Sequence, residues 1–252
     1  MRWSEPIFCP ADGKAWKRGL AIAVFAATIP CPGFAQATAA PAPAAPANRF
    51  VVVLDAAHGG DDTGGHSGDW TEKSFTLALS VRLRSLLTAR GFAVVTTRES
   101  DTTLTSERRI EIANHAGAQA CLDLHASLSG TGIHLFVSSL AAQAPVRFEP
   151  WRTAQAAFVT HSLALAGVLN SALQRTGTPV TLGRTALPVI DSLTCPAVAV
   201  EISPESTTNR PASESATDSL NDAGYQARAA EALSAALVEW RSDAAHLEAV
   251  QP

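Results

Sequence analysis

Short apolar runs rich in β-branched residues alternate with longer stretches of helical periodicity from about residue 49 to residue 241. This alternation is typical of a β-sheet covered by helices, because each strand buries its side chains against neighbouring helices. The expected strands are 50–54, 92–97, 120–125, 133–138, 187–190 and 197–202, and the expected helices are 69–89, 105–116, 151–176 and 223–241. With 46% hydrophobic residues, the chain can bury one core of ordinary size, so we predict a single α/β domain.

The first residues indicate export. Cations at Lys14, Lys17 and Arg18 precede an apolar run over 19–29 and the small residues of 35–37, so 1–37 is predicted to be a signal peptide. The apolar run is much shorter than the roughly 20 residues of a membrane-spanning helix, and we therefore expect no stable membrane span. An Ala/Pro-rich linker over 38–48, a catalytic domain over 49–242 and a flexible tail over 243–252 complete the expected organisation. The expected location is the periplasm or cell envelope.

Charge and cysteine content restrict the partners and the redox state. The formal net charge is −4 and no basic run is present, so we expect no nucleic-acid partner. Loss of the signal peptide would leave only Cys121 and Cys195, both in apolar stretches. Export would permit a disulfide between them, but the sequence does not bring their Cα atoms within bonding range, and buried free thiols are the favoured alternative.

Four residues that can bind metal or carry protons lie at or near predicted strand ends. His58 follows the first strand, Glu72 begins the next helix, and His125 and Glu201 end later strands. Open α/β sheets place their sites at the carboxyl ends of strands, so these side chains should converge. Two imidazoles and a carboxylate with an open fourth position form a common catalytic zinc site, and a second carboxylate can carry protons. His58, Glu72 and His125 fit the ligand role, and Glu201 fits the proton carrier.

Each of these residues also has a structural interpretation. Asp69 and Glu72 have the spacing of a capping box, in which Glu72 would only satisfy the backbone amide of Asp69. His58 could be an ordinary loop histidine, and Asp123 alternates with His125 and could face the same side of its strand. Glu201 is the exception, because a carboxylate in the run Pro-Ala-Val-Ala-Val-Glu-Ile would be desolvated and would need a partner or a function.

Several segments together resemble the zinc-dependent N-acetylmuramoyl-L-alanine amidases. The matching segments are Leu54-Asp55-Ala56-Ala57-His58-Gly59-Gly60, Glu72, Thr97-Arg98-Glu99-Ser100-Asp101, Leu124-His125-Ala126-Ser127, Pro196-Ala197-Val198-Ala199-Val200-Glu201 and the stretch 225–233. The resemblance implies a mixed, roughly six-stranded sheet, Zn²⁺ bound by His58, Glu72 and His125, and Glu201 as the catalytic carboxylate. It also implies a hydrolase that uses a zinc-activated water to cut the amide between N-acetylmuramic acid and L-alanine in peptidoglycan.

The chain departs from the family pattern beside three of these residues. Ala56-Ala57 stands where the family usually has Pro-Gly, Ser127 stands where it has Asn, and the segment after Glu201 differs. Asp55 is expected to orient the loop or His58 without binding the metal itself. Arg184 is a weak candidate for substrate contact. The span 139–150 is too short for an inserted helix that would cover the zinc site, and no activator protein can be named.

Two other functions remain open. One is an amidase-fold protein that binds cell wall with little or no turnover, and the other is a zinc hydrolase of a different amide.

Overall fold

The computed structural model describes residues 49–146, 150–206 and 214–250, with side chains described as far as 243. These residues belong to one compact unit. The predicted signal peptide and linker lie outside the described residues. Among the described helices, no single one is long and apolar enough to cross a membrane; the pair Trp151–Ala157 and Val159–Gln174 meets that test only when taken together, and it bends by 66°.

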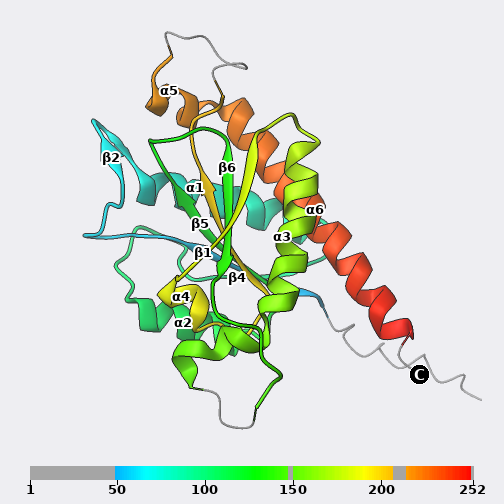
Figure 1. Cartoon of the computed structure of the whole chain (residues 1–252). Helices are drawn as coiled ribbons and strands as arrows, with labels where there is room; N and C mark the ends of the chain where they lie inside the picture. The colour runs from blue at the N-terminus through cyan, green and yellow to red at the C-terminus, as the bar shows by residue number, and fades with distance from the viewer. Residues whose placement is uncertain (1–48, 147–149, 207–213, 251–252) are drawn as a thin grey trace, which may run out of the picture. The chain divides into compact units, whose positions relative to one another are not determined.

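A mixed sheet of six strands forms the centre of the domain, as the family resemblance implied (Figure 1). Its strands are β1 (Val51–Ala56), β4 (Ala93–Thr96), β5 (Ala120–Ala126), β6 (Ile133–Ser138), β7 (Val180–Thr185) and β8 (Ala197–Ile202), in the order β4-β1-β5-β8-β6-β7. The first four strands in this order are parallel, whereas β6 and β7 run the opposite way. The carboxyl ends of β1, β5 and β8 therefore lie at the same end of the sheet as the amino ends of β6 and β7.

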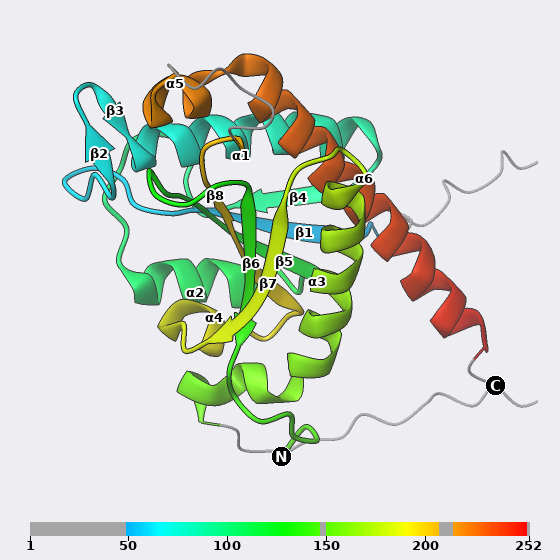
Figure 2. The same cartoon turned by 45° about the horizontal axis from the view of Figure 1, so that its top comes forward.

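Helices cover both faces of the sheet (Figure 2). One face packs against α1 (Glu72–Ala89), α3 (Val159–Gln174) and α6 (Ala223–Val250), and the other against α2 (Ser106–His115) and α4 (Pro188–Asp191). A 3₁₀ helix, η1 (Trp151–Ala157), and a short helix, α5 (Ala216–Asn221), complete the described helices. Alternation along the strands sets the two faces: Val52 and Leu54 join the core under α1, whereas Val53 and Cys121 join the core under α2.

Three predicted elements differ in the structure. The expected helix 151–176 is broken at Phe158, where η1 ends and α3 begins. The expected strand 187–190 is instead the helix α4, because Pro188 occupies its first turn and the Asp191 carboxylate accepts from the Leu187 amide. The outermost strand beside β6 is β7, which was not predicted because an edge strand exposed on most of its length carries no continuous apolar run.

Helix boundaries differ as well. Helix α1 begins at Glu72 rather than at 69, because a two-stranded ribbon of β2 (His66–Ser67) and β3 (Trp70–Thr71) occupies the preceding residues. Helix α6 continues to Val250, past the predicted end at Arg241. Residues 242–250 contain no glycine or proline, so nothing in this stretch stops the helix earlier.

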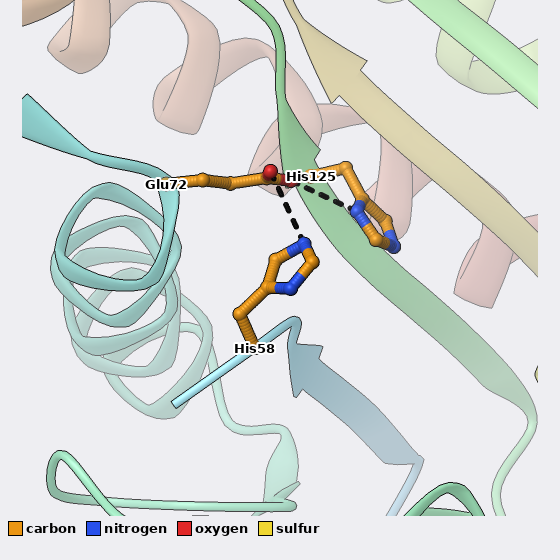
Figure 3. A group of neighbouring side chains, drawn as sticks. All are labelled: His58, Glu72 and His125. Carbon is orange, nitrogen blue, oxygen red and sulfur yellow. Dashed lines mark hydrogen bonds and ion pairs between the residues drawn. The ribbon is translucent and has the colours of Figure 1, made fainter. Parts of the chain in front are cut away.

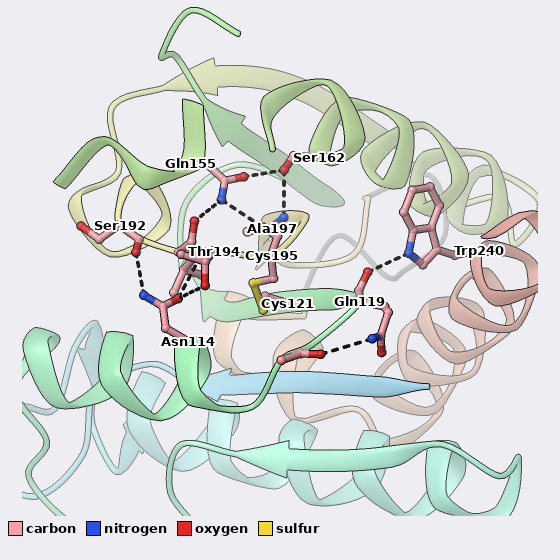
Figure 4. Close-up of a disulfide and its surroundings, with 12 residues drawn as sticks. Asn114, Gln119, Cys121, Gln155, Ser162, Ser192, Thr194, Cys195, Ala197 and Trp240 are labelled. Carbon is pink, nitrogen blue, oxygen red and sulfur yellow. Dashed lines mark hydrogen bonds between the residues drawn. A yellow bond between two sulfur atoms is a disulfide. The ribbon is translucent and has the colours of Figure 1, made fainter. Parts of the chain in front are cut away.

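Cys121 and Cys195 form a disulfide, so the favoured prediction of free thiols is wrong (Figure 4). The register between β5 and β8 explains the bond: Cys121 pairs with Ala197, which places Cys195, two residues earlier, beside it at a Cα–Cα distance of 6.2 Å. The sequence did not show this proximity because the pairing joins strands separated by α3 in the chain.

Candidate metal centre

The loop that follows β1 presents His58 in an unusual backbone conformation. His58 has a φ of 62°, in the left-handed region where a residue with a Cβ costs about 1–2 kcal/mol. Its carbonyl oxygen accepts from Nη2 of Arg109 at 2.5 Å, and its Nδ1 lies 2.8 Å from the Asp62 carboxylate. These contacts hold the backbone in this conformation and turn Nε2 of the ring toward α1.

Two buried arginines hold the remaining carbonyls of this loop. Nε of Arg98 and Nη1 of Arg109 donate to the Ala56 carbonyl at 2.8 and 2.7 Å, and Nη2 of Arg98 donates to the Ala57 carbonyl at 3.0 Å. Because every one of these acceptors is a backbone oxygen, the loop conformation depends on the arginines more than on the side chains of Ala56 and Ala57.

Asp55 acts on this loop through Arg109. Its Oδ1 accepts from Nη1 of Arg109 at 2.6 Å and from Thr97 at 2.6 Å, while the carboxylate beside the His58 ring belongs to Asp62. Burial and the neighbouring charge of Asp123 raise the pKa of Asp55, and Arg109 and Thr97 oppose that rise. Of the two roles expected for Asp55, the structure therefore supports orientation of the loop.

Glu72 connects the two histidines at the start of α1 (Figure 3). One carboxylate oxygen lies 3.1 Å from Nε2 of His58 and accepts from the Gly65 amide at 3.0 Å. The other lies 3.0 Å from Nδ1 of His125 and accepts from the Ala126 amide at 3.1 Å. Burial alone would raise the pKa of Glu72, but these hydrogen bonds hold it well below its ordinary range. The capping-box interpretation is wrong, because the N-cap is Thr71 and Glu72 bonds to neither Asp69 nor its amide.

His125 lies near the end of β5 with a carboxylate beside each ring nitrogen. Nδ1 faces Glu72, and Nε2 lies 3.3 Å from Oδ1 of Asp123. Burial alone would lower the pKa of His125, but the charges of Asp123 and Glu72 raise it to about 10. His125 thus lies within ion-pair distance of two carboxylates.

The three predicted ligands converge. His58, Glu72 and His125 each offer a donor atom, and these atoms lie within 4.8 Å of one another. Zn²⁺ binds imidazole nitrogen and carboxylate oxygen at about 2.0–2.2 Å, which places neighbouring ligands of one tetrahedral ion about 3.4 Å apart. The donor chemistry fits such an ion, and the distances of 3.0 and 3.1 Å from the two Glu72 oxygens to the His125 and His58 nitrogens are close to that spacing.

Glu201 lies beside the cluster on β8. It is the register partner of His125 on one side and of His134 on the other. Register partners point to the same face of a sheet, so Glu201 shares the face of His125 that α2 and α4 cover. Within the described residues, the side chain of Glu201 has no hydrogen bond or ion pair, and the residue is half-buried. A carboxylate in this setting can accept and release a proton.

The line of register partners that joins His125 to Glu201 continues across the sheet to two residues that were not predicted from the sequence. His134 on β6 pairs with Thr181 on β7, and its Nδ1 lies 2.6 Å from the Thr181 hydroxyl oxygen. No spacing signal marked His134, because only the antiparallel pairing of β6 with β8 brings it beside Glu201.

Arg184 is not brought to the cluster. It lies near the carboxyl end of β7. Because β7 runs opposite to β8, the carboxyl end of β7 lies at the end of the sheet opposite to the cluster. Its guanidinium donates to the carbonyls of Ser138 and Leu140 at 3.1 and 2.6 Å. The proposed contact between Arg184 and substrate therefore has no support in the structure.

A cavity of about 170 Å³ adjoins the cluster on the α2 side of the sheet. Its lining includes His58, Asp62, Leu104, Arg109, Asp123 and His125. His58 and His125 are therefore accessible from this face.

The fold and the cluster define an α/β protein with a candidate metal centre at the carboxyl ends of its central strands. The model of the N-acetylmuramoyl-L-alanine amidase family matches residues 52–239, and the chain belongs to this family. The germination-specific N-acetylmuramoyl-L-alanine amidase of Bacillus subtilis is 33% identical over 94 residues, which are 32% of this chain and 40% of that protein. N-acetylmuramoyl-L-alanine amidase AmiA of Escherichia coli is 41% identical over 80 residues, covering 31% of this chain and 27% of AmiA. The chain thus matches less than half the length of either relative.

Solved structures show the same fold over most of the chain. The catalytic domain of CwlV, an N-acetylmuramoyl-L-alanine amidase from Bacillus (Paenibacillus) polymyxa var. colistinus, superposes with a TM-score of 0.57 at 25% identity, covering 77% of this chain and 98% of that domain. Ami1 of Mycobacterium smegmatis gives a TM-score of 0.61 at 21% identity, with coverage of 77% and 97%.

Proposed function

We propose that this protein is a zinc-dependent hydrolase of peptidoglycan that cuts the amide bond between N-acetylmuramic acid and the L-alanine of the stem peptide. The observation that carries the proposal is the cluster of His58, Glu72 and His125, with Glu201 on the next strand. Membership of the amidase family supports the substrate class.

Four side chains have separate roles in the proposed reaction. His58, Glu72 and His125 would hold Zn²⁺, which when bound polarises the scissile carbonyl and lowers the pKa of a bound water. Glu201, on the same sheet face as His125 and unpaired among described residues, takes the proton of the attacking water. It then delivers that proton to the leaving nitrogen of L-alanine, so the amine departs neutral. Asp55 and Arg109 hold the loop that carries His58.

Export and a periplasmic or cell-envelope location belong to the same proposal. The disulfide between Cys121 and Cys195 supports them, because such bonds persist in oxidising compartments. Peptidoglycan or its fragments are the proposed partner. The structure of the CwlD amidase of Clostridioides difficile in complex with the GerS lipoprotein has a TM-score of 0.57 to this chain at 19% identity, and a regulatory protein partner is proposed here by analogy with that complex.

Digestion of purified peptidoglycan by the zinc-loaded protein tests the reaction, with products identified by mass spectrometry and Glu201→Ala as the control. The expected products are intact stem peptides with a free N-terminal L-alanine, reduced about 10²–10⁴-fold in rate in the variant. Binding to the wall at full zinc occupancy without cleavage would reject the proposal in favour of a wall-binding protein. Release of other fragments would indicate a hydrolase of a different amide.

A further inference from the structure

The imidazole of His125 lies between two carboxylates, of which one belongs to the cluster of three candidate ligands and the other does not. Glu72, one of the three clustered residues, lies 3.0 Å from Nδ1. Asp123, which is outside that cluster, lies 3.3 Å from Nε2 and comes from the same strand, two residues earlier. The side chain of Asp123 is only 9% exposed, so water does little to weaken its interaction with the ring.

Asp123 has no other described partner that would account for its burial. It is the register partner of Asp55, so two carboxylates lie side by side under α2. Arg109 forms an ion pair with Oδ1 of Asp55. Among the described residues, Asp123 forms an ion pair only with the His125 ring. A buried carboxylate costs free energy unless it is paired or hydrogen-bonded, and its position is therefore explained by what it does for His125.

We propose that Asp123 is a positioning residue that holds the His125 ring with Nδ1 toward the metal ion and the Nε2 proton directed at its own carboxylate. This inference rests on the proposed metal centre. A histidine ligand commonly donates its second ring N–H to a carboxylate, which fixes the tautomer and the ring orientation. Asp123 provides the carboxylate beside Nε2, at an ion-pair distance of 3.3 Å.

The two histidines then bind the ion through different nitrogens. His58 faces Glu72 with Nε2 and donates from Nδ1 to Asp62 at 2.8 Å, whereas His125 faces Glu72 with Nδ1. Each ligand has its own aspartate, but the Asp62 side chain is 63% exposed and that of Asp123 only 9%. Water can replace Asp62 more readily than Asp123, because the Asp62 carboxylate is the more exposed of the two.

Nitrogen-15 NMR of the zinc-loaded protein labelled at histidine tests the orientation directly, because long-range proton–nitrogen correlations distinguish the two tautomers. The expected result is a His125 with its proton on Nε2 and a His58 with its proton on Nδ1. The signals are assigned with histidine-to-glutamine variants of the other five histidines, which are His66, His115, His134, His161 and His246. A His125 with its proton on Nδ1 would overturn the inference.

Zinc affinity, measured by competition with a chelator, tests the contribution of Asp123. We expect Asp123→Ala to raise the dissociation constant about 10–100-fold, Asp123→Asn to raise it less because the amide oxygen still accepts from Nε2, and Asp62→Ala to have the smaller effect of the two alanine variants. Asp191→Asn, on α4 and bonded to Ser138 at the other edge of the sheet, is the control. Circular dichroism checks the fold of each variant.

The outcomes separate this inference from the proposed function. Unchanged affinity in both Asp123 variants, together with lost binding in His125→Ala, would reject the role of Asp123 and leave the metal centre intact. No zinc binding by the unaltered protein would reject the metal centre, and the role of Asp123 with it.

Discussion

At the scale of single residues, metal binding and proton transfer are assigned to different side chains. His125 contacts Glu72 within the cluster, whereas Glu201 lies on the neighbouring strand without a described partner. We therefore expect His125→Ala to lower bound zinc and Glu201→Ala to keep it while losing most hydrolysis. Elemental analysis of both purified variants, beside the peptidoglycan assay, checks the separation. Full zinc occupancy in His125→Ala would remove His125 from the site, and wild-type turnover in Glu201→Ala would reject its role as proton carrier.

Gly64 leaves the space in which His58 and Glu72 meet. It has a φ of 62°, and a Cβ there would lie 2.6 Å from a carboxylate oxygen of Glu72 and 2.6 Å from Cδ2 of His58. Gly64→Ala should therefore displace both ligands and reduce zinc affinity at least tenfold, in addition to a backbone cost of about 1–2 kcal/mol. Chelator competition and thermal unfolding measure the two effects.

Gly68 provides the matched control for that variant. Its φ is 57°, but nothing lies within 4 Å of a Cβ placed on it. Gly68→Ala should show the backbone cost alone, with unchanged zinc affinity. Equal zinc affinity in the two variants would show that the ligands tolerate a methyl group between them.

At the scale of elements, the loop between β1 and β2 is held by side chains from distant segments. Arg98, which is 4% exposed, donates to the carbonyls of Ala56, Ala57 and Lys73 and to the Thr76 hydroxyl. A lysine cannot reach these acceptors together, because it lacks the planar fork of the guanidinium. Arg98→Lys should lower the free energy of unfolding by about 2–3 kcal/mol, the cost of leaving buried acceptors unpaired.

Denaturant-induced unfolding measures that change, with Arg84→Lys as the control. Arg84 pairs with Glu99 on the surface, and its side chain is 44% exposed, so the change there should stay within about 0.5 kcal/mol. An equal effect of the two substitutions would mean that the carbonyl contacts of Arg98 do not stabilise the loop.

The elements that the sequence predicts well are those whose signal is local. Strand 133–138 and strand 197–202 match the structure, because each is a short and mainly apolar run. The convergence of His58, Glu72 and His125 was also predicted, since these residues belong to motifs that survive in this chain. What the sequence could not show was which residues meet across the sheet. The position of His134 beside Glu201 and the position of Arg184 both follow from strand order and direction.

At the scale of the whole domain, the site is assembled from segments that are far apart in the chain. Parallel pairing of β1, β5 and β8 brings their carboxyl ends to one edge, and the helices between them serve as crossovers. The disulfide joins β5 to the residue before β8, at the end of these two strands opposite to His125 and Glu201. It therefore links the two strands that carry both residues without contacting the candidate metal centre.

Reduction of this disulfide should destabilise the fold and leave the chemistry of the site unchanged. The bond closes a loop with a sequence separation of 74 residues, for which loss of chain entropy in the unfolded state corresponds to about 4 kcal/mol. Urea unfolding of the oxidised and reduced protein, and of Cys121→Ala/Cys195→Ala, measures the difference. The reduced protein keeps both sulfur atoms and so isolates the cross-link from the cavity that alanine leaves. Zinc affinity should be equal in the folded oxidised and reduced forms. A weaker affinity after reduction would show that the register of β5 and β8, and with it the position of His125, depends on the bond.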